Sequence, residues 1–159
     1  MYICGIDPGF SGAWALLDHN GTYLGCDDLP HDGKKILVQS VIDSVLALAK
    51  PADWFDIVVE DVHAMPGQGV SSTFKFGVAF GGAMAVAERL EGETVFVSPR
   101  LWKKHMGLDS DKDRSLEMAR ILWPTAPLKR KKDNGRAEAL LLAEWHRRQL
   151  WDSNSPKLS

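Results

Sequence analysis

A short apolar strand that ends in an acid is the feature that most constrains how this chain folds. Residues 2–6, Tyr-Ile-Cys-Gly-Ile, are typical of a central strand buried on both faces, and they run directly into Asp7, Pro8 and Gly9. A carboxylate is a poor strand former and is costly to bury without a partner. An acid at this place therefore indicates a binding site, and a cation is the simplest ligand.

Length and composition predict one soluble globular domain. A chain of 159 residues with 45% hydrophobic and 25% charged residues can bury a core, and we expect a domain over residues 1–151 followed by a polar tail over 152–159. Cys4 and Cys26 fall in predicted strands without metal-binding spacing, so we expect reduced core cysteines. No signal peptide is visible, and the longest uncharged apolar stretch, 76–87, is short for a bilayer, so we expect a cytoplasmic protein away from membranes.

Turns and helix caps divide the chain into strands followed by alternating strands and helices. Strands are predicted over 2–6, 12–17 and 22–27, with His19-Asn20-Gly21 as a hairpin turn between the last two. Further strands are predicted over 56–62 and 94–97, reached through crossover helices that favour parallel pairing. This order predicts an α/β fold with a five-stranded mixed sheet, three antiparallel strands and then parallel strands, flanked by helices.

Helices are predicted over 33–50, 71–90, 98–106, 111–122 and 134–150. Asp32 is the expected cap of the first of them, and Pro51 is expected to end it. The helix over 71–90 is apolar almost all round between 76 and 87, so we expect it to be buried in the domain or at a subunit interface. Its glycines, Gly77, Gly81 and Gly82, are expected to let another backbone approach closely.

Other acids are placed where they can converge on Asp7. The strand at 56–62 is expected beside the first strand, so that their carboxyl ends lie together, and alternation puts Glu60 and Asp61 on opposite faces. We choose Glu60, because it directly follows the apolar run. Glu138 lies among small and apolar residues of the last helix, which turns it towards the interior or a cleft. Asp133 can join these acids if it folds back, and it suits a helix N-cap equally well.

These four acids, Asp7, Glu60, Asp133 and Glu138, are the candidate metal ligands and catalytic residues. Two Mg²⁺ ions about 3.5–4 Å apart can activate water and stabilise the leaving oxygen in phosphodiester cleavage. Mg²⁺ takes hard oxygen ligands, with Mn²⁺ as a substitute, whereas the lack of clustered Cys or His disfavours zinc. The pattern predicts a metal-dependent nuclease.

Local charge supports a nucleic-acid partner, although the net charge of −2 does not. A basic run at 129–132, Lys-Arg-Lys-Lys, directly precedes Asp133, and Lys103-Lys104 forms a shorter one. Such runs are common on solvated surfaces, and the first gains weight because candidate site acids follow it.

Several motifs together resemble one family. They are Gly5-Ile6-Asp7-Pro8-Gly9, Val58-Val59-Glu60, the stretches 65–72 and 74–77, Ser98 to Lys103, and Arg136 to Leu140. In these motifs and in the order of its elements the chain resembles the RuvC-like Holliday junction resolvases of the ribonuclease H-like superfamily, in particular the small phage and prophage type.

The resemblance implies a homodimer that binds a four-way DNA junction and nicks two strands symmetrically with Mg²⁺ or Mn²⁺. It implies that Asp7, Glu60 and Glu138 are metal ligands. The bacterial type often has an acid or His three residues before the last ligand, where this chain has Gly135. Asp133 is the nearest substitute and Asn134 a weaker one. A phage origin would place the protein in the cytoplasm of a bacterial host.

The same resemblance gives roles to basic and apolar residues. Phosphate contacts are expected from Lys103, Lys104, Lys129, Arg130, Lys131, Lys132 and Arg136. Met65, Phe74 and Phe76 are candidates for wedging into the junction centre. Phe74 and Phe76 can instead be core or dimer contacts, which is the favoured role for Phe76.

Three other interpretations stay open. One is a ribonuclease H-like nuclease acting on RNA or on other branched DNA. Another is a phosphotransferase of the actin and sugar-kinase type, which opens with a similar acidic strand but needs two such domains. The third is a junction-binding protein without catalysis, which the glycine at position 135 favours.

Overall fold

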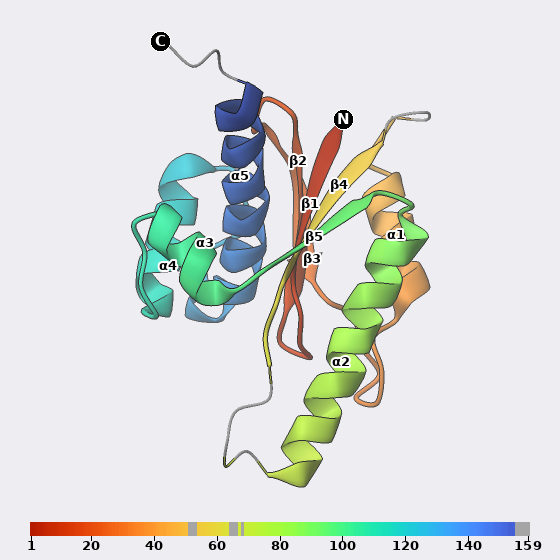
Figure 1. The fold of residues 1–159 in the computed structure, drawn as a ribbon. Helices are drawn as coiled ribbons and strands as arrows, with labels where there is room; N and C mark the ends of the chain where they lie inside the picture. The colour runs from red at the N-terminus through yellow and green to blue at the C-terminus, as the bar shows by residue number, and fades with distance from the viewer. Residues whose placement is uncertain (51–53, 64–66, 68, 155–159) are drawn as a thin grey trace.

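In the computed structural model, the protein has three layers, a central sheet with helices on each of its two faces (Figure 1). The structure describes residues 1–50, 54–63, 67 and 69–154. Helices α3 (Pro99–His105), α4 (Lys112–Leu122) and α5 (Asn134–Asn154) cover one face of the sheet, and α1 (Val38–Leu46) and α2 (Val70–Arg89) cover the other. A short 3₁₀ turn, η1 (Lys131–Asp133), leads into α5.

The sheet confirms the predicted fold class. Its strands are β1 (Tyr2–Asp7), β2 (Ala13–Asp18), β3 (Tyr23–Asp28), β4 (Phe55–Glu60) and β5 (Glu93–Val97), in the order β3-β2-β1-β4-β5. The first three strands pair antiparallel, and β1, β4 and β5 pair parallel. The central strand β1 is thus the expected buried strand with an acid at its carboxyl end.

The predicted helix over 33–50 is wrong at its start. Helix α1 begins at Val38, and Leu37 rather than Asp32 is its N-cap. The Asp32 carboxylate instead accepts hydrogen bonds from the amides of Lys34 and Lys35, which closes a local turn. Aspartate stabilises such turns as readily as helix starts, and the sequence pattern alone does not separate the two. The helix also ends before the predicted Lys50, at Leu46 with Ala47 as its C-cap, and Pro51 itself lies outside the described residues.

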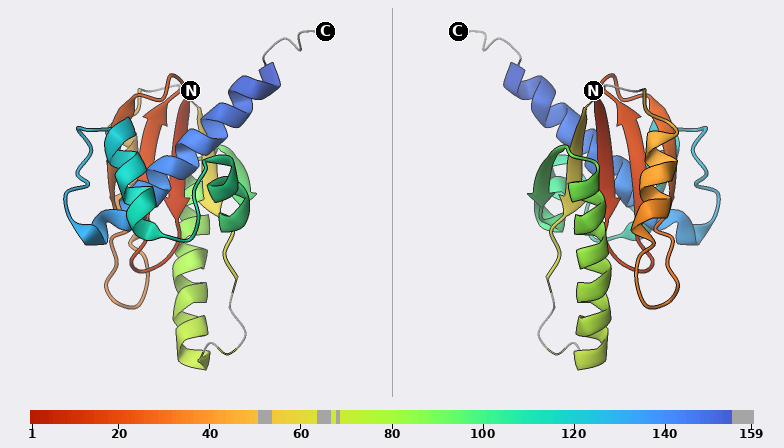
Figure 2. Two further views of the ribbon diagram at one scale, coloured as in Figure 1. Left: turned by 90° about the vertical axis from the view of Figure 1, so that its left-hand side faces the viewer. Right: turned by 90° about the vertical axis from the view of Figure 1, so that its right-hand side faces the viewer.

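Helix α2 is buried within the domain along one side of its second half only, and the alternative that its apolar surface lies at a subunit interface stays a prediction. None of residues 70–78 is buried, whereas Ala79, Ala83, Val86 and Ala87 pack inside. Figure 2 shows this helix running well past the edge of the sheet. By length and composition α2 could cross a membrane, which is weak evidence because a core helix of a soluble protein passes the same test.

Two hydrophobic cores lie on the two faces of the sheet and follow the alternation of the strands. On β1, Tyr2, Cys4 and Ile6 pack towards α1 and α2, whereas Ile3 packs towards α5. Both cysteines are buried and unpaired, which confirms their expected place in the core.

Gly5 lets α5 lie directly on β1. A Cβ atom at this position would stand 2.0 Å from the carbonyl oxygen of Ala139 and 2.9 Å from the amide nitrogen of Ala143. Both atoms belong to the helix backbone, which cannot move aside as a flexible side chain can. This close approach brings the first turns of α5 to the end of β1, where Asp7 lies.

Gly5→Ala should therefore lower the free energy of unfolding by about 3 kcal/mol, because a methyl group would push α5 off the sheet. The matched control is Gly77→Ala in α2, where a Cβ meets nothing within 4 Å. That change should be neutral or stabilising by up to about 1 kcal/mol. Urea unfolding of both variants measures the difference, and equal midpoints would contradict the close packing of α5 on β1.

Candidate active site

Asp7 and Glu60 lie side by side because of the register of β1 and β4. Ile6 pairs with Val59 in parallel register, so the next residue on each strand is an acid. Val58 packs in the core under α5, and alternation therefore turns Glu60 to the same face. Asp61, the neighbour on the other face, instead lies near the surface with an oxygen 3.5 Å from His63 Nε2.

Glu138 brings a third carboxylate from α5 to the same place. Burial, together with the negative charges of Glu60 and Glu138, holds the pKa of Asp7 well above its usual range. Burial also raises the pKa of Glu60, and the charge of Glu138 adds to this shift. Glu60 is only 6% exposed and Glu138 only 4%. The three acids predicted to converge are thus close enough to repel one another.

Helix α3 supplies partners for two of these acids from consecutive residues. The indole Nε1 of Trp102 donates a hydrogen bond to Glu60 Oε1 at 2.9 Å. Lys103 Nζ donates to Glu138 Oε1 at 2.6 Å, with both side chains largely buried. The positive charge of Lys112, at the start of α4, offsets part of the rise in the pKa values of Asp7 and Glu60. The motif resemblance predicted contacts from Lys103 to DNA, whereas its ammonium lies among the acids here.

The three carboxylates suit a hard divalent cation in kind and charge, but their oxygens lie too far apart to bind one ion together. Within the described part of the chain, no group of three or more His, Cys, Asp or Glu side chains lies close enough to hold a metal ion. Two features are consistent with acids that stay apart. Their negative charges repel one another, and the ammonium of Lys103 already neutralises the charge of Glu138. Oxygen donors of this type are those that Mg²⁺ and Mn²⁺ prefer.

Asp133 is the last residue of η1 and caps this turn together with Arg130, rather than acting as the expected N-cap of the last helix, and the structure does not place it with the other acids. Its carboxylate accepts hydrogen bonds from the backbone amide of Arg130 at 2.7 Å and from the Arg130 Nε at 2.8 Å. Burial opposes its ionisation, but these hydrogen bonds lower its pKa overall. A ligand role for Asp133 would require breaking this pair with Arg130.

Gly135 has no room for the acid or histidine often found at this position in the family that the chain resembles. A Cβ at Gly135 would lie 2.8 Å from the backbone oxygen of Ser11 and 3.4 Å from Asp7 Oδ2. The α5 backbone itself thus approaches Asp7, and a side chain here would require the turn after β1 to move.

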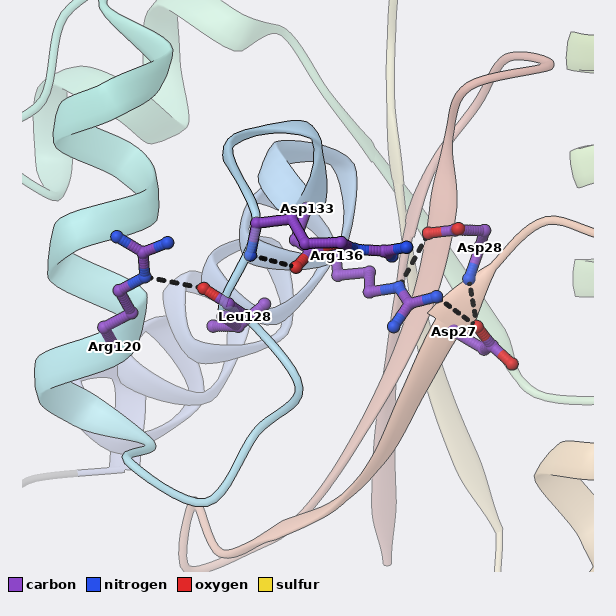
Figure 3. A network of polar contacts seen from close by, with 7 residues as sticks. Asp27, Asp28, Arg120, Leu128, Asp133 and Arg136 are labelled. Carbon is purple, nitrogen blue, oxygen red and sulfur yellow. Dashed lines mark hydrogen bonds and ion pairs between the residues drawn. The ribbon is translucent and has the colours of Figure 1, made fainter.

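Arg136 is paired with two acids in this structure, so the phosphate contact predicted for it would require release from them. It is only 14% exposed, and its Nη2 and Nε donate to Asp27 and Asp28 at 2.6 and 2.7 Å. Figure 3 shows this side chain reaching from α5 to the end of β3. Arg130 is likewise engaged with Asp133. Both arginines thus hold the start of α5 in place.

The other predicted DNA contacts lie at the surface. Lys104, Lys129, Lys131 and Lys132 are exposed, although Lys131 lies 3.0 Å from an oxygen of Asp113. Phe74 is 72% exposed on the projecting part of α2, and Met65 lies outside the described residues. Sequence reasoning missed Trp102 and Lys112 as site residues. The only signal for Trp102 was its place next to Lys103 in the motif at 98–103.

Comparison with known proteins confirms the fold. No family profile and no curated protein matches the sequence. Among solved structures, the chain is similar to Thermus thermophilus RuvC in complex with a Holliday junction substrate, with a TM-score of 0.66 and 19% identity over 98% of both chains. A second T. thermophilus RuvC structure gives 0.65 and 18% identity, covering 97% of this chain and 98% of that one.

These values define the class of the fold: it is RuvC-like and belongs to the ribonuclease H-like type, as the motifs predicted. The phage type within that class stays a prediction.

The charge of Asp7 should make the protein less stable at neutral pH when no cation is bound. A carboxyl group with a raised pKa in the folded state favours folding below its unfolded pKa, and this contribution is lost as the pH rises through the folded pKa. Asp7→Asn should therefore be more stable than wild type by on the order of 1 kcal/mol at pH 8 in EDTA. The gain should shrink as the pH falls towards 4, because the Asp7 carboxyl group becomes protonated in the folded state.

Thermal unfolding across this pH range measures the effect. Asp61→Asn, next to Glu60 but on the other face, is the matched control and should not show the gain. Lower stability of Asp7→Asn than of wild type at pH 8 in EDTA would contradict the repulsion.

Proposed function

We propose that the protein is a divalent-metal-dependent endodeoxyribonuclease that resolves four-way DNA junctions by symmetric paired nicks. The observation that carries the proposal is the convergence of Asp7, Glu60 and Glu138 from β1, β4 and α5 on one face of a RuvC-like sheet. Buried acids that repel one another are costly to stability, and a site of this kind is typical of cation binding.

In this mechanism Asp7, Glu60 and Glu138 would hold Mg²⁺, with Mn²⁺ as its substitute. A bound metal would supply Lewis acidity for activating a water molecule and stabilising the leaving oxygen. Glu60 is oriented by Trp102, and Lys103 and Lys112 place positive charge where a scissile phosphate approaches the acids. Attack of water on phosphorus then leaves a 5′-phosphate and a 3′-hydroxyl.

Basic residues around the acids support DNA as the substrate. A groove beside α3 is lined by Arg100, Lys103 and Lys104 together with apolar residues and Asp109. Lys129, Lys131 and Lys132 precede α5 at the surface. Such cations hold phosphates without reading sequence, which suits recognition of a DNA shape. The related T. thermophilus RuvC was solved with a Holliday junction substrate, which supports branched DNA as the partner.

Two symmetric nicks need two active sites, so we propose a homodimer. The projecting half of α2 exposes apolar residues, Val70 and Phe74 among them, and Gly77 and Gly81 leave open space around the helix. In our proposal this segment supplies part of the dimer contact, and Phe74 inserts at the junction centre.

A second candidate, a junction-binding protein without catalysis, is favoured by two observations. Lys103 is paired with Glu138, and Gly135 leaves no room for a fourth ligand. This alternative predicts junction binding without Mg²⁺-dependent nicks. A ribonuclease H-like nuclease for RNA or other branched DNA is the nearest catalytic alternative, and a substrate panel separates it.

Wild-type protein with Mg²⁺ should nick a labelled four-way junction in two symmetric strands and leave a matched linear duplex intact. Asp7→Asn and Glu60→Gln should each lower the nicking rate by more than about 100-fold, because each removes a charged ligand. Asp61→Asn should retain activity, and EDTA should abolish it.

Tight junction binding without nicks in Mg²⁺ or Mn²⁺ would replace the nuclease by the non-catalytic alternative. Equal cutting of junction and duplex, or preferential cutting of an RNA–DNA hybrid, would assign another substrate. Full activity in both acid variants would overturn the assigned site.

A further inference from the structure

Helix α3 contacts two of the three site acids through neighbouring side chains, one aromatic and one charged. Trp102 donates its indole N–H to Glu60 Oε1 at 2.9 Å, and Lys103 donates to Glu138 Oε1 at 2.6 Å. The two acids belong to β4 and α5, so one turn of α3 contacts both elements that carry them. The lysine is long and flexible, whereas the tryptophan is fixed by its surroundings.

Trp102 is the largest fully buried side chain in the described part of the protein, with 0% exposure. Its ring belongs to the core between the sheet and helices α3, α4 and α5, which includes Val58, Leu116 and Leu140. A buried indole N–H needs an acceptor, but a backbone carbonyl would serve. Trp123 shows this, because its Nε1 donates to the carbonyl oxygen of Gly21 at 3.0 Å.

We propose that Trp102 is a positioning residue of the metal site: its N–H fixes one oxygen of Glu60 in place and so sets the affinity of the three acids for a divalent cation. This inference rests on the proposed function. A carboxylate with one oxygen held by a rigid donor loses less freedom when it binds a cation with the other. The hydrogen bond also gives Glu60 a partner that remains compatible with its negative charge.

A structural role alone would also explain a buried tryptophan, so the test must separate the N–H from the ring. Trp102→Phe keeps an aromatic ring in the core and removes the hydrogen bond to Glu60. Trp123→Phe is the matched control, since it removes a similar bond from a buried indole to a backbone carbonyl. Both variants lose packing, but only the first loses a contact to a site acid.

The experiment is a titration of the full chain with Mn²⁺, with free ion measured by electron paramagnetic resonance. We expect Trp102→Phe to weaken Mn²⁺ binding by about 10–100-fold, the usual effect of removing a partner of a metal ligand. Trp123→Phe should stay within about twofold of wild type. In junction nicking, Trp102→Phe should need more Mn²⁺ for half-maximal rate and recover most of the rate at saturation.

Equal Mn²⁺ affinity in Trp102→Phe and wild type would overturn the proposal and leave the nuclease function standing. If the wild-type protein binds Mn²⁺ but nicks no DNA, the nuclease function is refuted. Weaker Mn²⁺ binding by Trp102→Phe than by wild type would in that case still support the positioning role. A wild-type protein that binds no Mn²⁺ would overturn both.

A measurement on the wild-type fold covers the case in which Trp102→Phe does not fold. The indole ¹H–¹⁵N resonance of Trp102 should shift when Mg²⁺ is added and in Glu60→Gln, because both change the acceptor. The resonance of Trp123 should not move in either experiment. An unmoved Trp102 resonance would overturn the proposal.

Discussion

Repulsion among three carboxylates in a confined space is the constraint on which the site depends. Asp7 ends the central strand, Glu60 ends its parallel neighbour, and Glu138 approaches from α5. Glu60 and Glu138 are buried and Asp7 is partly buried, which makes their negative charges costly, and burial and the neighbouring acids raise the pKa of Asp7. The negative charge is partly balanced by Lys103, Lys112 and the N–H of Trp102, and the remaining charge suits the site to a cation.

The backbone packing that brings the acids together also limits what else the site can hold. Gly5 lets α5 rest directly on β1, and Gly135 brings the first turn of the helix up to the backbone of Ser11. The start of the helix is then held by charged pairs. Arg136 pairs with Asp27 and Asp28 (Figure 3), and Arg130 pairs with Asp133. Arginines in a basic stretch here stabilise the position of Glu138, while the neighbouring lysines remain at the surface.

Much of the fold and the three central acids could be predicted from the sequence, because they follow from local periodicity. Alternation along β4 selects Glu60 over Asp61, and the apolar neighbours of Glu138 turn it inwards. The predictions that were wrong concern polar side chains that can pair with more than one group. Asp32 closes a turn instead of capping a helix, and Asp133 pairs with Arg130 instead of joining the acids. Arg136 pairs with Asp28 and Asp27, which precede it by 108 and 109 positions, and no local sequence pattern indicates so distant a pair.

The direct test of this account is a crystal structure of the wild-type protein soaked in Mn²⁺, with an anomalous difference map recorded to locate the ion. The account predicts a peak bounded by Asp7, Glu60 and Glu138, with Lys103 Nζ moved away from Glu138 and the Trp102 hydrogen bond to Glu60 retained. A map without a peak among these acids, in which Lys103 still pairs with Glu138, would contradict it.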